Sequence, residues 1–147
     1  LYFNNGDPET TVKLYEERYV FIAPKLLTVS KEKQITWAEV AQIPLCLLTQ
    51  NMKNRQLIDR HFLDLGISPS IVTEASDFTA VLAQVAAGNA ATIAPVSVAQ
   101  TFLDLKSTKQ LDLIRPVLTH SVGLSIKDQS PVLPMIEALR KAVKSAL

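Results

Sequence analysis

Short apolar runs alternate along the chain with segments whose apolar residues recur every three or four positions. The uninterrupted run Leu45–Leu48 is typical of a strand that is buried on both faces. Residues 70–74 and 91–94 also favour short strands, since they are β-branched or apolar and lie between turn residues. The apolar residues of 51–65 and 77–87 recur at helical spacing. The middle of the chain therefore predicts an α/β fold, with parallel strands joined by helical crossovers.

Capping signals mark the ends of the predicted helices. Side chains suited to the N-cap are Thr36, which forms a capping box with Glu39, then Asn51, and then Ser76 or Asp77. The first of these helices is expected to end near Ile43-Pro44. Gly66 and Gly88 are expected to end the other two, because glycine accepts the left-handed backbone of a helix C-terminus. Pro95 is suited to open a further helix at its first position.

The two ends of the chain predict further strands and one helix. The expected elements are a strand end at 1–3, one or two strands over 12–23 broken near Glu16-Glu17, a loop over 24–33, a polar loop over 107–110, strands over 111–115 and 121–127, and a last helix that starts at Ser130-Pro131. The sequence shows no internal repeat and no low-complexity segment.

Composition narrows the class of protein. The chain has 147 residues, 48% of them hydrophobic and 20% charged, which is typical of a globular domain. A formal net charge of +1 argues against a nucleic-acid surface within this segment. The single cysteine, Cys46, suits a reducing compartment, so a cytoplasmic location is expected. No apolar run reaches the roughly 20 residues that span a bilayer. Because the chain begins at Leu1 rather than Met, it is interpreted as part of a longer protein.

Polar residues follow the three strands predicted in the middle of the chain. These turns are Thr49-Gln50-Asn51, Ala75-Ser76-Asp77 and Pro95-Val96-Ser97. In parallel α/β sheets ligands bind beyond the carboxyl ends of the strands, and a helix N-terminus favours an anion. The pattern predicts a small polar ligand, carboxylate- or sulfate-bearing, at these turns. The alternative is that Asn51, Ser76 and Asp77 only cap their helices.

No other pattern in the sequence predicts a metal, cofactor or catalytic site. His61 and His120 have no cysteine or second histidine at ligand spacing. Cys46 lies within an apolar strand and is interpreted as a packed, unreactive thiol. The carboxylates form no obvious acid–base pair, and the four glycines make no phosphate-binding loop. No cofactor is expected, and the chain is predicted not to be an enzyme.

Several segments together resemble the effector-binding domain of LysR-type transcriptional regulators. They run in register from about Tyr15 to Leu147 and comprise Thr36-Trp37-Ala38-Glu39-Val40, Ile43-Pro44-Leu45, Asn54-Arg55, Leu65-Gly66, Glu74-Ala75-Ser76-Asp77, Val81 to Gly88, and Ile93-Ala94-Pro95. No single motif is diagnostic, so their joint order and spacing carry the resemblance.

The resemblance implies the type-II periplasmic-binding-protein-like α/β fold, with two Rossmann-like lobes of which the first is incomplete. Residues 21–117 would form lobe II, and residues 1–20 with 118–147 would form part of lobe I. An effector would lie in the cleft between the lobes. The polar strand-end turns of the family fall on Thr49-Gln50-Asn51 and Ser76, and Phe3 is a further candidate at a strand end in lobe I.

The function implied by the resemblance is effector sensing. A small metabolite would control DNA binding by an attached winged helix-turn-helix domain, which this sequence lacks, in a homodimer or homotetramer without a membrane partner. The alternative is a solute-binding protein of a transporter with the same lobes. A third possibility, a small enzyme on this fold, would need an acid, base or nucleophile in the cleft, where the sequence predicts only neutral polar groups.

Overall fold

The computed structural model describes residues 11–28, 33–102, 106–125 and 134–146. The chain divides into two compact units, which we call unit 1 (residues 1–17 with 120–147) and unit 2 (residues 18–119). The predicted strand end at 1–3, the candidate Phe3 and the predicted helix start at Ser130-Pro131 lie outside the described residues.

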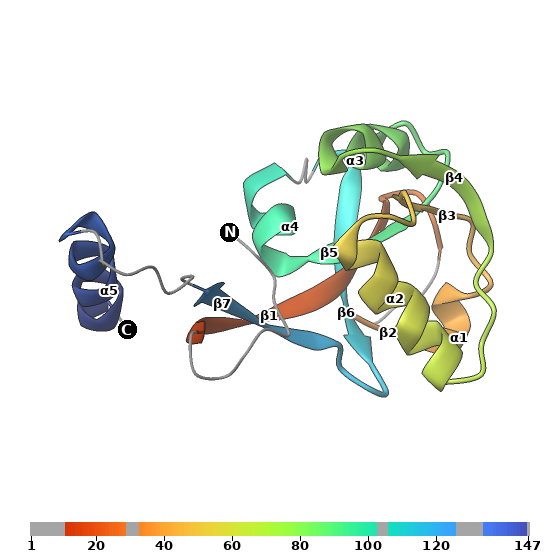
Figure 1. Ribbon diagram of the computed structural model, residues 1–147. Coiled ribbons are helices and arrows are strands. Elements are labelled where there is room, and N and C mark those ends of the chain that lie inside the picture. The colour runs from red at the N-terminus through yellow and green to blue at the C-terminus, as the bar shows by residue number, and fades with distance from the viewer. Residues whose placement is uncertain (1–10, 29–32, 103–105, 126–133, 147) are drawn as a thin grey trace. The chain divides into compact units, whose positions relative to one another are not determined.

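Strands and helices alternate through most of the described chain (Figure 1). In chain order the elements are β1 (Thr11–Pro24), β2 (Gln34–Thr36), α1 (Trp37–Val40), β3 (Leu45–Leu48), α2 (Lys53–Asp64), β4 (Ile71–Ala75), α3 (Phe78–Ala86), β5 (Thr92–Pro95), α4 (Val96–Phe102), β6 (Thr108–Ile114), β7 (Thr119–Ser125) and α5 (Pro134–Ala146).

Unit 2 contains a mixed sheet in the strand order β2-β6-β1-β5. The central strand β1 runs antiparallel to both neighbours, so that Phe21 lies opposite Ile93 of β5 and Leu111 of β6. The short strand β2 runs parallel to β6. A second sheet consists of the parallel pair β3 and β4, and a parallel bridge between Leu45 and Ala91 links β3 to the residue before β5.

Alternate residues of β1 pack against helices on opposite faces of the sheet. Phe21 belongs to a cluster with Trp37 of α1 and Phe62 of α2. Its neighbour Ile22 belongs to another cluster, with Val85 of α3. Because successive side chains of a strand point to opposite faces, a strand with helices on both sides carries apolar residues at every position.

The strand β3 shows the same two-sided burial, as its uninterrupted apolar run predicts. All four of its residues are buried. Leu47 packs in one cluster with Ile58 of α2, and Cys46 packs in another with Val81 of α3. The prediction of a strand at Leu45–Leu48 buried on both faces is confirmed.

The capping box at the start of α1 is also confirmed. The Glu39 amide donates to the Thr36 hydroxyl oxygen at 3.4 Å, and the Thr36 amide donates to the Glu39 carboxylate at 2.8 Å. The expected end of this helix near Ile43-Pro44 is wrong, since α1 ends at Val40. Beyond it the chain continues in single turns, in which the Ile43 amide donates to the Val40 carbonyl.

The start of α2 differs from the prediction that Asn51 caps it. The N-cap is Met52, which has an extended backbone and no side-chain hydrogen bond to the helix. Its side chain packs instead against the cluster that contains Cys46 and Leu48. Asn51 accepts a hydrogen bond from the Thr49 hydroxyl at 2.7 Å. Packing of the N-cap side chain has therefore displaced the local polar cap.

Three further predicted helix boundaries, at Asp77, Gly66 and Gly88, agree with the structure, whereas the one at Pro95 does not. Asp77 caps α3, because its carboxylate accepts from the Ala80 amide at 2.9 Å. Gly66 and Gly88 follow α2 and α3 with φ of 66° and 84°, the left-handed conformation that favours glycine. Pro95 does not open α4 as predicted, since it ends β5 and the helix begins at Val96.

Three strand boundaries also differ from the sequence prediction. β1 continues through Glu16-Glu17 without a break. The predicted loop at 107–110 is mostly strand, because β6 begins at Thr108 and pairs there with Pro24. The strand β2 lies where no strand was predicted, and its three residues are held by the parallel pairing with β6. In each case a distant strand supplies the hydrogen bonds that the local sequence does not indicate.

The described part of unit 1 consists of the start of β1, the strand β7 and the helix α5. β7 pairs with β1, and the Ser121 hydroxyl donates to the Glu16 carboxylate at 2.5 Å. No helix among the described residues is both long and apolar enough to cross a membrane.

Candidate functional site: the strand-end turns of unit 2

The parallel pairing of β3 and β4 brings two predicted site residues together. Leu48 lies opposite Ala75 at the ends of the two strands, and the Thr49 amide donates to the Ala75 carbonyl at 3.0 Å. Thr49 and Ser76 therefore follow adjacent strand ends. Because β5 is joined to β3 by a parallel bridge, it runs in the same direction as β3 and β4. The three predicted turns thus follow strands that run the same way.

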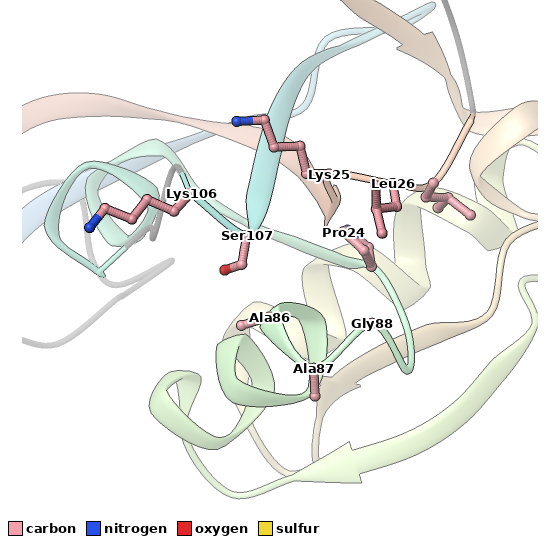
Figure 2. Close-up of a pocket in the computed structure, with 9 residues that line it drawn as sticks. Pro24, Lys25, Leu26, Ala86, Ala87, Gly88, Lys106 and Ser107 are labelled. Carbon is pink, nitrogen blue, oxygen red and sulfur yellow. The ribbon is translucent and has the colours of Figure 1, made fainter.

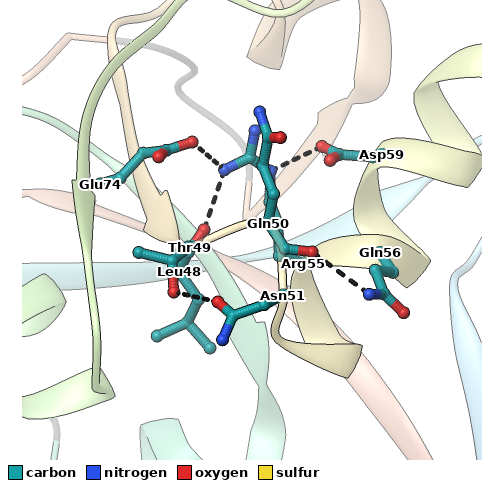
Figure 3. A network of polar contacts seen from close by, with 8 residues as sticks. All are labelled: Leu48, Thr49, Gln50, Asn51, Arg55, Gln56, Asp59 and Glu74. Carbon is teal, nitrogen blue, oxygen red and sulfur yellow. Dashed lines mark hydrogen bonds and ion pairs between the residues drawn. The ribbon is translucent and has the colours of Figure 1, made fainter.

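The turn from Thr49 to Met52 is closed by its own hydrogen bonds. The Met52 amide donates to the Thr49 carbonyl at 2.9 Å, and the Thr49 hydroxyl donates to the Asn51 side-chain oxygen at 2.7 Å. Gln56 donates from its side chain to the Gln50 carbonyl at 3.2 Å (Figure 3). Thr49 is half-buried, whereas Gln50 and Asn51 are exposed. The turn therefore presents side-chain amides to solvent on a fixed backbone.

The helix N-termini that follow these two turns differ in one respect. The carboxylate of Asp77 already occupies the first turn of α3 through its bond from the Ala80 amide. The first turn of α2 receives no hydrogen bond from its N-cap side chain, Met52. An acceptor group of a ligand would therefore be better satisfied at α2, beside Thr49-Gln50-Asn51, than at α3.

A buried arginine lies directly beneath this turn (Figure 3). Arg55, with only 4% of its side chain exposed, donates to the Leu48 carbonyl at 2.8 Å, to Glu74 at 2.5 Å and to Asp59 at 2.7 Å. Burial lowers the pKa of the guanidinium, but the hydrogen bonds that it donates to Glu74 and Asp59, with the charges of these carboxylates, outweigh burial and raise the pKa above its ordinary value. The arginine is therefore charged, and it joins β3, β4 and α2.

Sequence reasoning did not assign Arg55 to the site. Asp59, four residues further along the helix, was the only local signal of an ion pair. Glu74 lies 19 residues away and the Leu48 carbonyl belongs to another element, so the main partners depend on the tertiary fold. Asn54 was missed for the same reason, because its side-chain oxygen accepts from the buried Tyr19 hydroxyl at 2.5 Å.

The remaining predicted residues belong to the third strand end. Pro95 is buried and lies opposite Tyr19 of β1, so its side chain belongs to the packed sheet. Ser97 is exposed in the first turn of α4, and its carbonyl accepts from the Thr101 hydroxyl at 2.8 Å.

A surface hollow of about 620 Å³ lies at the other end of α3 from Ser76. It is lined by Pro24, Lys25, Leu26, Leu27, Ala86, Ala87, Gly88, Lys106 and Ser107 (Figure 2). In this view the amino groups of Lys25 and Lys106 extend away from the small residues of the wall. The hollow is therefore mostly apolar and separate from the strand-end turns, and sequence reasoning gave no sign of it.

Other reactive side chains of the described chain offer little chemistry. Cys46 is fully buried, and burial raises the pKa of its thiol, so the thiol stays protonated. No group of three or more His, Cys, Asp or Glu side chains within the described residues is arranged to hold a metal ion.

The LysR substrate binding domain profile matches residues 2–147, nearly the whole chain. The chain belongs to the LysR substrate binding domain family. This family has the type-II periplasmic-binding-protein-like α/β fold, which confirms the fold that the resemblance to LysR-type regulators implies. No curated protein matches the chain.

Solved structures of LysR-type regulators have the same fold as this family member. The effector binding domain of QuiR in complex with shikimate has a TM-score of 0.77 at 18% identity, covering 95% of this chain and 66% of that one. The Synechocystis PCC6803 CcmR regulatory domain in complex with 2-PG has a TM-score of 0.80 at 10% identity, covering 97% and 70%. CbnR, a LysR family transcriptional regulator, has a TM-score of 0.76 at 20% identity, covering 90% and 46%. The chain thus spans less than two thirds of the QuiR and CbnR structures.

Proposed function

We propose that this LysR substrate binding domain senses a small polar or anionic metabolite at the strand-end turns of unit 2. The observation that carries the proposal is the adjacency of Thr49 and Ser76, whose strands end side by side and are joined by the bond from the Thr49 amide to the Ala75 carbonyl. Ligands of open α/β sheets bind at such carboxyl ends.

The chemistry of the turn favours a ligand with acceptor oxygens. Thr49-Gln50-Asn51 offers hydroxyl and amide groups, and the uncapped first turn of α2 offers backbone amides. These groups are neutral and orient a carboxylate or sulfate by hydrogen bonds, while the charge of the buried Arg55 is paired with Glu74 and Asp59. Ser76 extends the same polar surface, with Ser97 and Pro95 at the third strand end as further candidates.

The family membership favours a regulator over the solute-binding protein of a transporter. Two structurally similar domains are described as complexes with shikimate and with 2-PG, and full-length CbnR as a complex with target DNA. By analogy, effector binding in this chain would bias the DNA binding of an attached winged helix-turn-helix domain in a cytoplasmic homodimer or homotetramer. The role is binding rather than catalysis, since the turn offers only neutral polar groups.

The test is a titration of the chain with sulfate, inorganic phosphate, glycolate and shikimate, followed by NMR at the backbone amides. The amides of Thr49, Gln50 and Asn51 should shift with at least one of these probes. Thr49→Val should weaken that affinity by roughly tenfold, because it removes a hydroxyl from the turn.

Thr73→Val is the matched control, because it makes the same change on an exposed residue of β4 that lies before the strand end. It should leave the affinity within about twofold of the wild type. The proposal would be contradicted if every probe left the amides at 49–51 and 76 unshifted, or if both threonine variants lost affinity equally.

A further inference from the structure

We infer that Arg55 is a positioning residue, which fixes the backbone of the turn at Thr49-Gln50-Asn51 in its ligand-binding geometry. The inference rests on the function proposed for that turn, and it assigns a role to a residue that makes no part of the exposed surface. Three kinds of observation support it: the partners of Arg55, its burial and its place in the sequence.

The partners of Arg55 lie on both strands that end at the site. Its Nη1 donates to the carbonyl of Leu48, the last residue of β3, and to the carboxylate of Glu74 on β4. The Leu48 carbonyl belongs to the same peptide unit as the Thr49 amide, which in turn donates to Ala75. Because a peptide unit is planar, the arginine and Ala75 together set the orientation with which the chain enters the turn.

The far side of the turn is also fixed by Arg55 and its neighbour. Arg55 lies in the first turn of α2, three residues after the N-cap Met52. Asn54 accepts a hydrogen bond from Tyr19, which is 1% exposed and belongs to β1. Asn54, just after the turn, is thus hydrogen-bonded to β1. Leu48, just before the turn, is hydrogen-bonded to Arg55 of α2. The exposed residues at 50 and 51 lie between these two fixed points.

Arginine suits this task better than lysine. From Nη1 its rigid, planar guanidinium reaches both strand partners, the Leu48 carbonyl and the Glu74 carboxylate, while Nε pairs with Asp59 on the same helix. A lysine would carry the same charge on a flexible stem and would not hold these partners in a fixed plane. Arg55→Lys therefore removes positioning while it keeps the buried charge.

The test compares amide hydrogen exchange in the full 147-residue chain. The reporters are the amides of Thr49 and Met52, whose hydrogen bonds close the turn. The reference is the amide of Cys46 in β3, which donates to the Ala91 carbonyl. In Arg55→Lys, exchange at both reporters should accelerate by roughly tenfold more than at the reference. Equal acceleration of all three amides would show a merely structural role and overturn the inference.

Two further variants separate the partners. Glu74→Gln should accelerate the reporters selectively, as Arg55→Lys does, because it weakens the tie to β4. Asp59→Asn is the matched control, since Asp59 holds the guanidinium only from within α2, and it should leave the ratio of reporter to reference exchange as in the wild type. Selective acceleration in Asp59→Asn, or none in Glu74→Gln, would also overturn the inference.

A sulfate titration of the same variants links positioning to binding. Arg55→Lys should weaken sulfate binding by roughly tenfold, with Asp59→Asn within about twofold of the wild type. If the wild type does not respond to sulfate, the proposal that the turn binds sulfate is contradicted. The hydrogen-exchange comparison then still decides the role of Arg55. If sulfate binds and Arg55→Lys binds it equally well, the positioning role fails while the binding site stands.

Discussion

His61 lies on α2 with its ring centroid 4.2 Å from that of Trp37. Its Nε2 atom is buried and has no hydrogen-bond partner among the described residues. Burial lowers the pKa of this histidine, and the charge of Asp64 offsets part of that effect. The fold therefore favours the neutral imidazole, whereas the unfolded chain takes up a proton near the ordinary pKa of about 6.5.

This difference predicts that stability falls as the pH drops. Because the folded pKa is the lower one, the contribution of His61 is complete above about pH 6.5 and is lost as the pH falls toward the folded pKa. Urea unfolding at a series of pH values between about 5 and 8 measures it. His61→Gln should flatten the decline in this window.

Asp64→Asn provides the control for the histidine prediction. Removal of the carboxylate should lower the pKa of His61 further, since the charge of Asp64 raises it. The decline in stability on acidification should then become larger, and the NMR titration of the His61 ring should move to lower pH. A decline that persists unchanged in His61→Gln would assign it to other groups.

At the scale of a single element, the two faces of α2 differ most clearly in how far their apolar side chains are buried. Phe62 is 2% exposed and meets Trp37 edge-on, with ring centroids 5.0 Å apart, whereas Leu63 beside it is 71% exposed. Phe62→Ala should cost about 3–5 kcal/mol of unfolding free energy, because it leaves a cavity in the core. Leu63→Ala should stay within about 0.5 kcal/mol of the wild type. Urea unfolding of both variants measures the difference, and similar losses would contradict this assignment of the faces.

The sequence predicted those features of the fold that depend on residues close together in the chain. The capping box of Thr36 with Glu39, the cap at Asp77 and the left-handed Gly66 and Gly88 depend on residues a few positions apart. The four consecutive apolar residues of β3 likewise indicate that each of them is buried. The starts of α1 and α3, the glycines that follow α2 and α3, and the buried strand were therefore visible in the sequence.

Elements that depend on distant partners were not predicted. β2 and the start of β6 contain polar residues. β2 is a strand because it pairs with the end of β6, and the start of β6 is a strand because it pairs with β1. The position of Asn51 was misread because a core contact of Met52, not a local hydrogen bond, decides the N-cap of α2. Adjacency of Thr49 and Ser76 followed from the parallel pattern, whereas the partners of Arg55 required the fold itself.

At the scale of the whole molecule, the apolar clusters of the described residues all belong to unit 2. They extend from Tyr19 to Leu118, and the strand β1 runs through two of them. The proposed binding turn, its ties to Arg55 and the tie between Asn54 and Tyr19 lie within the same unit. Unit 2 thus holds both the core and the geometry of its strand-end site.

Unit 2 should therefore fold by itself. The single tryptophan, Trp37, reports on this, because its indole is 1% exposed and donates to the Pro116 carbonyl at 2.8 Å. A fragment of residues 18–119 should show the blue-shifted emission of a buried indole and a cooperative thermal transition. A fragment of residues 23–119 is the control, since it lacks the part of β1 that pairs with β5 and should lose both signals. Emission typical of a solvated indole in the 18–119 fragment would show that unit 2 depends on the rest of the chain for its core.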